Sequence, residues 1–203
     1  MTLFAVITGD LVKSSSYQST DYERLLYLLD QSLRLLSPPH YYNIYRGDAF
    51  QLLLTEPEQA VRAALLLRLN LIAEASDARL CIAIGPADNL RADIKTATGP
   101  VFTLSGTGLD QLAQQRWSLY CADASQPLDL LLRFADKLLL QLTARQAQVL
   151  LLYLLATDQS HQALAIELNT SRANVTALLN QANYGLFNDF LQHCQNWIHH
   201  YVQ

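Results

Sequence analysis

Residues 41–55, "YYNIYRGDAFQLLLT", contain two apolar runs that are separated by the pair Gly47-Asp48. The runs are rich in aromatic and aliphatic side chains, which favour strands, and Gly-Asp is a common turn pair. This stretch therefore predicts a β-hairpin with its turn at Gly47-Asp48. It also places a carboxylate at the tip of a hairpin that borders the hydrophobic core, and that position needs a functional or a structural explanation.

The segments around the hairpin alternate between strand and helix patterns up to about residue 125. We expect a strand at 3–10, a helix from Asp21 to Pro38-Pro39, a helix from Glu56-Pro57 to about Ala75, a strand at 78–88, a helix within 97–115 and a strand at 117–123. The order β-α-β-β-α-β-α-β predicts an α+β domain of residues 1–125. We expect a ferredoxin-like, mainly antiparallel sheet with its helices on one face.

Residues 126–203 contain only helix patterns, which predicts a separate all-α domain. Thr143 is suited to cap the helix that follows it, and the short segment "SHQALAIEL" is followed by the break "NTS" at 169–171. One long stretch, "RANVTALLNQANYGLFNDFLQHCQNWI" (172–198), comes next. This rhythm is typical of the helix-turn-helix of many bacterial regulators.

In such DNA-binding proteins, residues at the start of the second helix contact base edges in the major groove. The corresponding residues of this chain are Ser171, Arg172, Asn174, Thr176 and, further along, Gln181. Arginine suits guanine and asparagine suits adenine, so DNA is an expected partner. The charge of the segment opposes this interpretation, because four basic residues face five acidic ones between 126 and 203. The alternative is a helical bundle that mediates dimerisation.

The composition narrows the class of protein. The net charge of −4 and the pI of about 5.6 argue against a broad, positively charged surface that binds nucleic acid or an anionic membrane. No apolar run reaches the roughly 18 residues of a membrane span, and the first residues lack the features of a signal peptide. The three cysteines are widely spaced, which favours neither a disulfide framework nor a zinc site. We expect a cytoplasmic protein with no membrane partner.

A second Gly-Asp pair ends the first strand at Gly9-Asp10. If the first strand and the hairpin are neighbours, Asp10 and Asp48 lie within reach of one divalent ion, Mg²⁺ or Mn²⁺, and such ions bind carboxylates together with substrate phosphates. Gly9 and Gly47 would let backbone amides approach a phosphate closely. Further candidates for a phosphate pocket are Lys13, Ser14 and Arg46. The alternative is that both aspartates are turn residues that cap their own backbone, with the neighbouring polar residues in solvent.

The strand ending in "ITGD" and the hairpin "YRGDAF" resemble the nucleotidyl cyclase fold, which class III cyclases and GGDEF diguanylate cyclases share. "RLCIAIG" (79–85) and "GPVFTLSG" (99–106) resemble later motifs of the same fold. Together with "VITGDLVKSS" and the helix-turn-helix, the chain is similar to the SatD-like family of bacterial proteins over roughly residues 3 to 185. This resemblance implies a cyclase-like α+β domain whose two metal-binding aspartates correspond to Asp10 and Asp48.

The resemblance also shows departures from the cyclases. Class III cyclases use an Asn and an Arg at the transition state, and the alignment of the motif puts Thr103 and Thr107 at those places. Threonine can still bind a ligand by a hydrogen bond, but it carries no charge to offset a developing phosphate anion. Ala49 stands where diguanylate cyclases have an acid after the second aspartate. These departures imply that cyclisation is lost, whereas the binding of a nucleotide or another phosphorylated ligand is kept.

The sequence therefore favours a transcriptional regulator in which a ligand-sensing domain is joined to a DNA-binding domain, acting as a homodimer. Two alternatives stay open at this point. One is a Mg²⁺-dependent, nucleotide-processing enzyme that uses Asp10 and Asp48. The other is a catalytically inactive scaffold that only dimerises.

Overall fold

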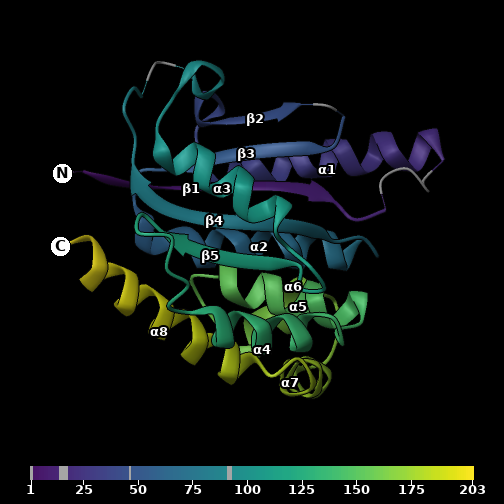
Figure 1. The fold of residues 1–203 in the computed structure, drawn as a ribbon. Coiled ribbons are helices and arrows are strands. Elements are labelled where there is room, and N and C mark those ends of the chain that lie inside the picture. Colours follow the sequence, from purple (N-terminus) through teal and green to yellow (C-terminus); the bar gives the residue numbers. More distant parts are fainter. Residues whose placement is uncertain (1, 14–17, 46, 91–92) are drawn as a thin grey trace.

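A computed structural model describes residues 2–13, 18–45, 47–90 and 93–203 of the chain (Figure 1). Within these residues the protein is α+β, with five strands in one sheet and eight α-helices. The strands are β1 (Leu3–Leu11), β2 (Tyr42–Tyr45), β3 (Ala49–Leu54), β4 (Ala78–Pro86) and β5 (Trp117–Cys121). The helices are α1 (Ser19–Leu36), α2 (Ala60–Ala73), α3 (Pro100–Asp110), α4 (Asp129–Leu139), α5 (Ala144–Leu155), α6 (His161–Glu167), α7 (Arg172–Gln181) and α8 (Tyr184–Val202), and short 3-10 turns lie at Pro39–Tyr41, Pro57–Gln59 and Ile94–Thr96.

The sheet has the strand order β2-β3-β1-β4-β5 (Figure 1). The first four strands pair antiparallel, but β5 runs parallel to β4. The sheet is therefore mainly antiparallel, as expected, but it is mixed because its edge strand β5 is parallel. The reason is that α3 intervenes between β4 and β5, and a helical crossover returns the chain in the same direction.

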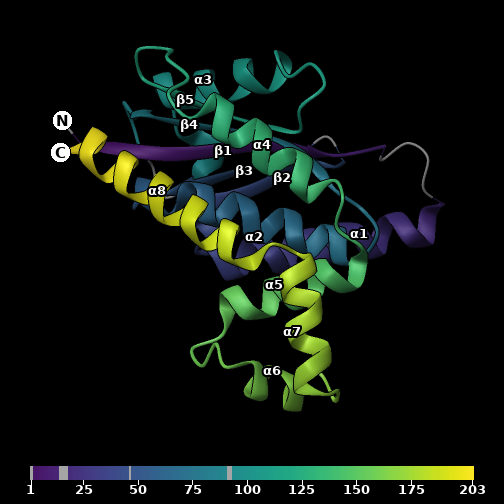
Figure 2. The same cartoon turned by 90° about the horizontal axis from the view of Figure 1, so that it is seen from below.

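Helices cover both faces of the sheet, which corrects the expectation of helices on one face only. Figure 2 shows α1 and α2 on one side of the strands and α3 on the other. Along β1, Ala5 and Ile7 belong to the core cluster on the α1 and α2 side, whereas Val6 belongs to the cluster beneath α3. The alternating side chains of β1 are thus apolar on both faces, and each face needs a cover.

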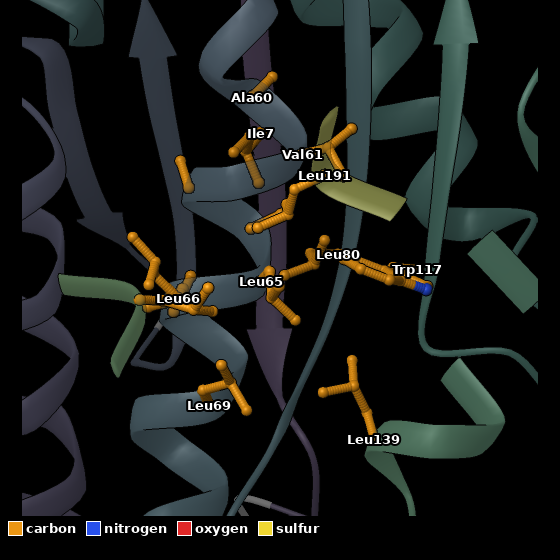
Figure 3. Close-up of a cluster of buried hydrophobic side chains, with 14 of the residues drawn as sticks. Ile7, Ala60, Val61, Leu65, Leu66, Leu69, Leu80, Trp117, Leu139 and Leu191 are labelled. Atoms are coloured by element: carbon orange, nitrogen blue, oxygen red, sulfur yellow. The ribbon is translucent and has the colours of Figure 1, made fainter. Parts of the chain in front are cut away.

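The core runs without a break from the sheet into the C-terminal helices. In Figure 3, Val61 of α2 lies beside Leu191 of α8, and Leu65 of α2 lies beside Leu80 of β4. All four belong to one core cluster, which also contains Trp117 of β5. Arg62 also donates a hydrogen bond to the carbonyl of Leu154 in α5. The division into residues 1–125 and 126–203 stays a prediction, and its boundary lies within one continuous core.

The C-terminal helices differ in one respect from their sequence pattern. The stretch 172–198 forms two helices, α7 and α8, because Asn183 adopts a left-handed conformation with φ of 56° between them. Asparagine tolerates this conformation better than most residues. Figure 2 shows α6 and α7 at the end of the molecule that is farthest from α3.

Among the described residues, no helix is long and apolar enough to cross a bilayer.

Candidate functional site

The hairpin turn lies beside the C-terminal end of β1. Gly9 of β1 pairs with Phe50 of β3, and Asp10 pairs with Arg79 of β4. Asp48 comes directly before β3, in the turn that Gly47 forms with φ of +92°. The structure thus gathers both predicted aspartates at the same end of neighbouring strands.

Arg79 forms an ion pair with Asp10 at this end of the strands. Its Nε donates to Oδ1 of Asp10 at 2.9 Å, and its Nη2 donates to Oδ2 at 2.6 Å. These hydrogen bonds raise the pKa of Arg79 most, partial burial lowers it, and the negative charges of Asp10, Asp110 and Asp48 raise it further. Three carboxylates from β1, the hairpin and the end of α3 therefore act on one guanidinium.

The carboxylates suit a divalent ion by chemistry, but their arrangement does not fit one as it stands. Both oxygens of Asp10 accept hydrogen bonds from Arg79, which supplies the positive charge that an ion would supply. Among the residues that the structure describes, no group of three or more His, Cys, Asp or Glu side chains is placed to hold a metal ion. Arg79 therefore competes with an ion for the oxygens of Asp10.

Gly9 has a packing role in this region. A Cβ at Gly9 would lie 2.5 Å from the ring of Phe50 and 2.6 Å from the carbonyl oxygen of Arg79. The glycine therefore lets the buried Phe50 ring and strand β4 come close to β1. Its missing side chain leaves no open space for a phosphate on that side.

A buried polar row lies next to the carboxylates, on the face that α3 covers. The hydroxyls of Thr8 and Ser105 are 2.7 Å apart, and Gln51 donates to Thr8 at 3.1 Å. Ser105 also donates to the carbonyl of Phe102. Thr8 and Asp10 are two residues apart on β1, so their side chains point to the same face of the sheet. In the sequence, only this alternation along the strand indicated that Thr8 lies beside the carboxylates.

Cys81 of β4 pairs with Thr8 of β1, so it belongs to the same row of the sheet. Its environment keeps the thiol protonated, because burial raises the pKa of Cys81 to about 11. Gly108 of α3 packs so closely that a Cβ there would lie 2.4 Å from the sulfur. Cys81 is therefore a packing residue and is not a nucleophile at neutral pH.

Thr103 and Thr107 lie away from the aspartates. Both are exposed, and Thr107 donates a hydrogen bond to the carbonyl of Thr103 at 2.7 Å. They line a cavity of about 460 Å³ together with Tyr120 of β5, whereas neither Asp10 nor Asp48 lines it. The predicted ligand role of Thr103 therefore belongs to a different hollow from that of the predicted metal ligands.

Lys13 also lines a different cavity, one of about 400 Å³ that includes Arg116, Asp77 and leucines from the end of α4. This cavity lies where the sheet meets the helical part. Ser14 and Arg46, the two remaining candidates for phosphate binding, lie outside the described residues. Of these three candidates the structure therefore describes only Lys13, and it lines a cavity that neither Asp10 nor Asp48 lines.

A buried ion network adjoins this second cavity, and no local sequence pattern had indicated it. Arg68 of α2 donates two hydrogen bonds to Asp77 at 2.9 and 2.7 Å and one to Asp136 of α4 at 2.7 Å. Arg116 donates to Asp77 through Nη1 and to Asp136 through its backbone N–H. The two arginines and two aspartates balance in charge and join α2, α4 and the start of β4 and β5.

The predicted DNA-contacting residues lie at and after the turn between α6 and α7. Ser171 caps α7 by accepting from the N–H of Asn174, whose side chain donates to Thr170. Arg172 and Asn174 are exposed, and Arg172 forms no side-chain ion pair or hydrogen bond within the described residues.

Two further predicted DNA contacts, Thr176 and Gln181, are engaged with neighbouring helices. Thr176 is half-buried and lies 2.8 Å from a ring nitrogen of His161, and it also donates to the carbonyl of Arg172. Gln181 accepts a hydrogen bond from Gln146 of α5. The start of α7 is therefore freer to contact a partner than its middle or its end.

No protein-family model matches the sequence, and a search of curated proteins finds no significant match.

Proposed function

We propose that this protein is a cytoplasmic transcriptional regulator of the SatD-like type. In this proposal a nucleotidyl-cyclase-like domain senses a nucleotide or another phosphorylated ligand, and α6 and α7 act as a helix-turn-helix that binds DNA as part of a homodimer. Cyclase activity is absent. The proposal keeps Mg²⁺ or Mn²⁺ as a companion of the ligand.

The observation that carries the proposal is the geometry of α7. The helix packs against α5 and α6 through its buried residues Val175 and Leu179, while Arg172 and Asn174 are exposed in its first turn. A helix held in this way can enter a major groove with its N-terminal residues towards the bases.

The charge balance around α7 is less adverse than the sequence count indicated. Asp136 is buried in an ion pair with Arg68. Only four of the five acidic residues between 126 and 203 therefore remain accessible to solvent. Four basic residues then face four acidic ones. We therefore expect base contacts to contribute much of the affinity, with only a shallow dependence on salt.

Three observations support a cyclase-like sensing domain without cyclisation. The strand order β2-β3-β1-β4, with α1 and α2 on one face, is that of a ferredoxin-like unit, and β5 adds a strand at one edge. Asp10 and Asp48 both act on Arg79. Thr103 and Thr107 line a separate cavity and carry no charge for a transition state.

Selection of bound duplexes from a random DNA pool tests the DNA-binding half of the proposal. Asn174→Ala should weaken binding to the selected sequence by roughly 5- to 150-fold, the loss expected for a side chain that contacts a base edge. Asn180→Ala is the matched control, because Asn180 is also exposed but lies near the end of α7. Equal binding by both variants, or no enrichment at all, contradicts DNA recognition through α7.

Thermal-shift titrations test the sensing half. Mg²⁺ and Mn²⁺ are added with and without a panel of nucleoside triphosphates, to the wild type and to Asp48→Asn. We expect stabilisation that needs both metal and nucleotide and that is lost in the variant. No shift with any combination contradicts nucleotide sensing, and together with a negative DNA selection it favours the scaffold.

The second candidate function is a metal-dependent, nucleotide-processing enzyme, and the position of Asp10 and Asp48 around Arg79 is the observation that favours it. Product analysis with triphosphates and Mg²⁺ or Mn²⁺ separates the two candidates. Turnover by the wild type that Asp10→Asn abolishes supports the enzyme. Ligand-dependent DNA binding that changes in Asp10→Asn, with no turnover by either protein, supports the regulator.

A further inference from the structure

An apolar groove of about 500 Å³ lies between α4 and the first half of α8. Its walls are mainly the side chains of Leu131, Phe134, Leu138, Leu186, Phe187 and Phe190. Phe134 is 64% exposed and Leu186 is 57% exposed, and Leu130 beside the groove is 60% exposed. Figures 1 and 2 show α4 and α8 on the outside of the molecule, and the start of α8 adjoins α7.

The sequence of α4 gives this helix more apolar surface than the monomer uses. Leu132, Ala135 and Leu139 are buried in the core. Leu130 and Phe134 form a second apolar face, which is exposed. A helix that packs only against its own chain normally has a polar outer face. The outer face of α4 therefore has the composition of a surface that is covered in the assembled protein.

The area of the patch fits a partner of standard size. The exposed fractions of Leu130, Leu131, Phe134 and Leu186 together equal about two fully exposed large side chains. At about 200 Å² each, the upper end for such side chains, this is roughly 400 Å². Two such patches bury roughly 800 Å² of apolar area, which is about half of a standard interface of roughly 1,600 Å². A little over half of a typical interface is apolar, so the two areas agree.

Charges at the border of the groove are complementary within one copy of the chain. Lys137 from α4 and Asp189 from α8 both line the groove, and neither forms an ion pair with another described residue. In a two-fold symmetric pair the same patch meets itself, so an arrangement that brings Lys137 of one copy to Asp189 of the other forms that ion pair twice. A single surface that carries both signs beside an apolar centre is self-complementary.

We propose that a second copy of this chain covers the α4–α8 groove, which forms the interface of a two-fold symmetric homodimer. Leu186 and Phe190 lie in the first turns of α8, directly after α7. The interface therefore lies next to α7 in each copy. The dimer does not rest on the proposed DNA-binding function.

Sedimentation equilibrium of the full chain tests the interface. The wild type should have the mass of two chains, and Phe134→Glu should have the mass of one. Leu35→Glu is the matched control, because Leu35 is 80% exposed on α1, far from the groove in sequence and structure, and it should stay dimeric. Circular dichroism and a cooperative melt verify that each variant is folded.

A monomeric wild type at all concentrations overturns the proposal, and so does a folded Phe134→Glu that remains dimeric. A charge exchange adds a test of the pairing geometry. Lys137→Asp should weaken the dimer at least tenfold, and Lys137→Asp with Asp189→Lys should restore it. A double variant that dimerises no better than Lys137→Asp contradicts the two-fold arrangement. DNA selection is independent of these results, so a dimer without DNA binding would reject only the proposed function.

Discussion

Arg79 donates two parallel hydrogen bonds to the carboxylate of Asp10, from Nε to Oδ1 at 2.9 Å and from Nη2 to Oδ2 at 2.6 Å. This bidentate pair competes with an ion at the predicted metal site, because both oxygens of Asp10 accept hydrogen bonds from the arginine. The negative charges of Asp48 and Asp110 act on the same guanidinium. The affinity of Asp10 for an ion thus depends on how easily the hydrogen bonds between Arg79 and Asp10 break.

Arg79→Ala should create a stabilising response to Mg²⁺ alone, which we do not expect of the wild type. The substitution frees Asp10 while Asp48 and Asp110 remain, so the local charge becomes more negative. At about five times the dissociation constant, Mg²⁺ stabilises by about 1 kcal/mol, which raises Tm by about 2–4 °C. Arg79→Ala with Asp10→Asn is the control and should lose the response. Equal Mg²⁺ shifts in the wild type and in Arg79→Ala would show that Arg79 does not occlude the carboxylates.

Asp136→Asn should destabilise the protein strongly, because it leaves Arg68 buried with one fewer charged partner. Breaking a buried ion pair typically costs about 3–5 kcal/mol. Arg133→Ala removes an exposed pair with Asp129 on the same helix and should cost less than about 0.5 kcal/mol. Urea unfolding measures both values. Similar small losses in the two variants would mean that the buried network contributes little to holding α4 on the sheet.

Two glycines should respond to alanine with opposite signs. Gly9→Ala forces a methyl group against Phe50 and the β4 backbone, and overpacking of this kind costs about 1–3 kcal/mol. Gly106 lies within α3 with no other atom within 4 Å of an added Cβ. Gly106→Ala should therefore stabilise by about 0.5–1 kcal/mol through helix propensity. Destabilisation of equal size at both positions would contradict the packing described at Gly9.

Alkaline pH should destabilise the native state, since burial raises the pKa of Cys81 and Cys121 to about 11 and that of Cys194 to about 12. A raised folded-state pKa contributes stability that is present below the unfolded value of 9.0 and is lost as pH rises towards 11–12. Urea unfolding between pH 8 and pH 10.5 should show this decline, and Cys194→Ala should show a shallower one. A flat profile in the wild type would contradict the burial of the three thiols.

Much of the α+β part was predictable because its signals are local. The hairpin at 47–48 is confirmed, and the predicted strand at 3–10 is β1, which ends one residue later. Turn residues and alternating apolar side chains carry that information over a few residues. The position of Asp48 near the end of β1 followed from the neighbouring strands.

Other features depend on contacts that a local pattern does not contain. Arg68 lies in a leucine-rich helix, and its partner Asp136 is 68 residues away. The ion pair between Arg79 and Asp10 depends on the register of β1 and β4, which pairs these two residues although they are 69 positions apart in the sequence. Asn183 looked compatible with a continuous helix, and only its left-handed conformation divides α7 from α8. Thr103 and Lys13 line separate cavities because Thr103 lies on α3, whereas Lys13 follows the end of β1.

The most direct test of the proposed regulator is the salt dependence of DNA binding by Arg172→Ala, measured by fluorescence anisotropy on the selected duplex. If the start of α7 contacts DNA, the variant should bind more weakly than the wild type, and the slope of log K against log salt should fall by about 1 when the lost contact is to a phosphate. A loss of about 1–3 kcal/mol with relaxed sequence preference would instead indicate a base contact, which also supports the account. Unchanged affinity, slope and preference would contradict DNA recognition by this helix.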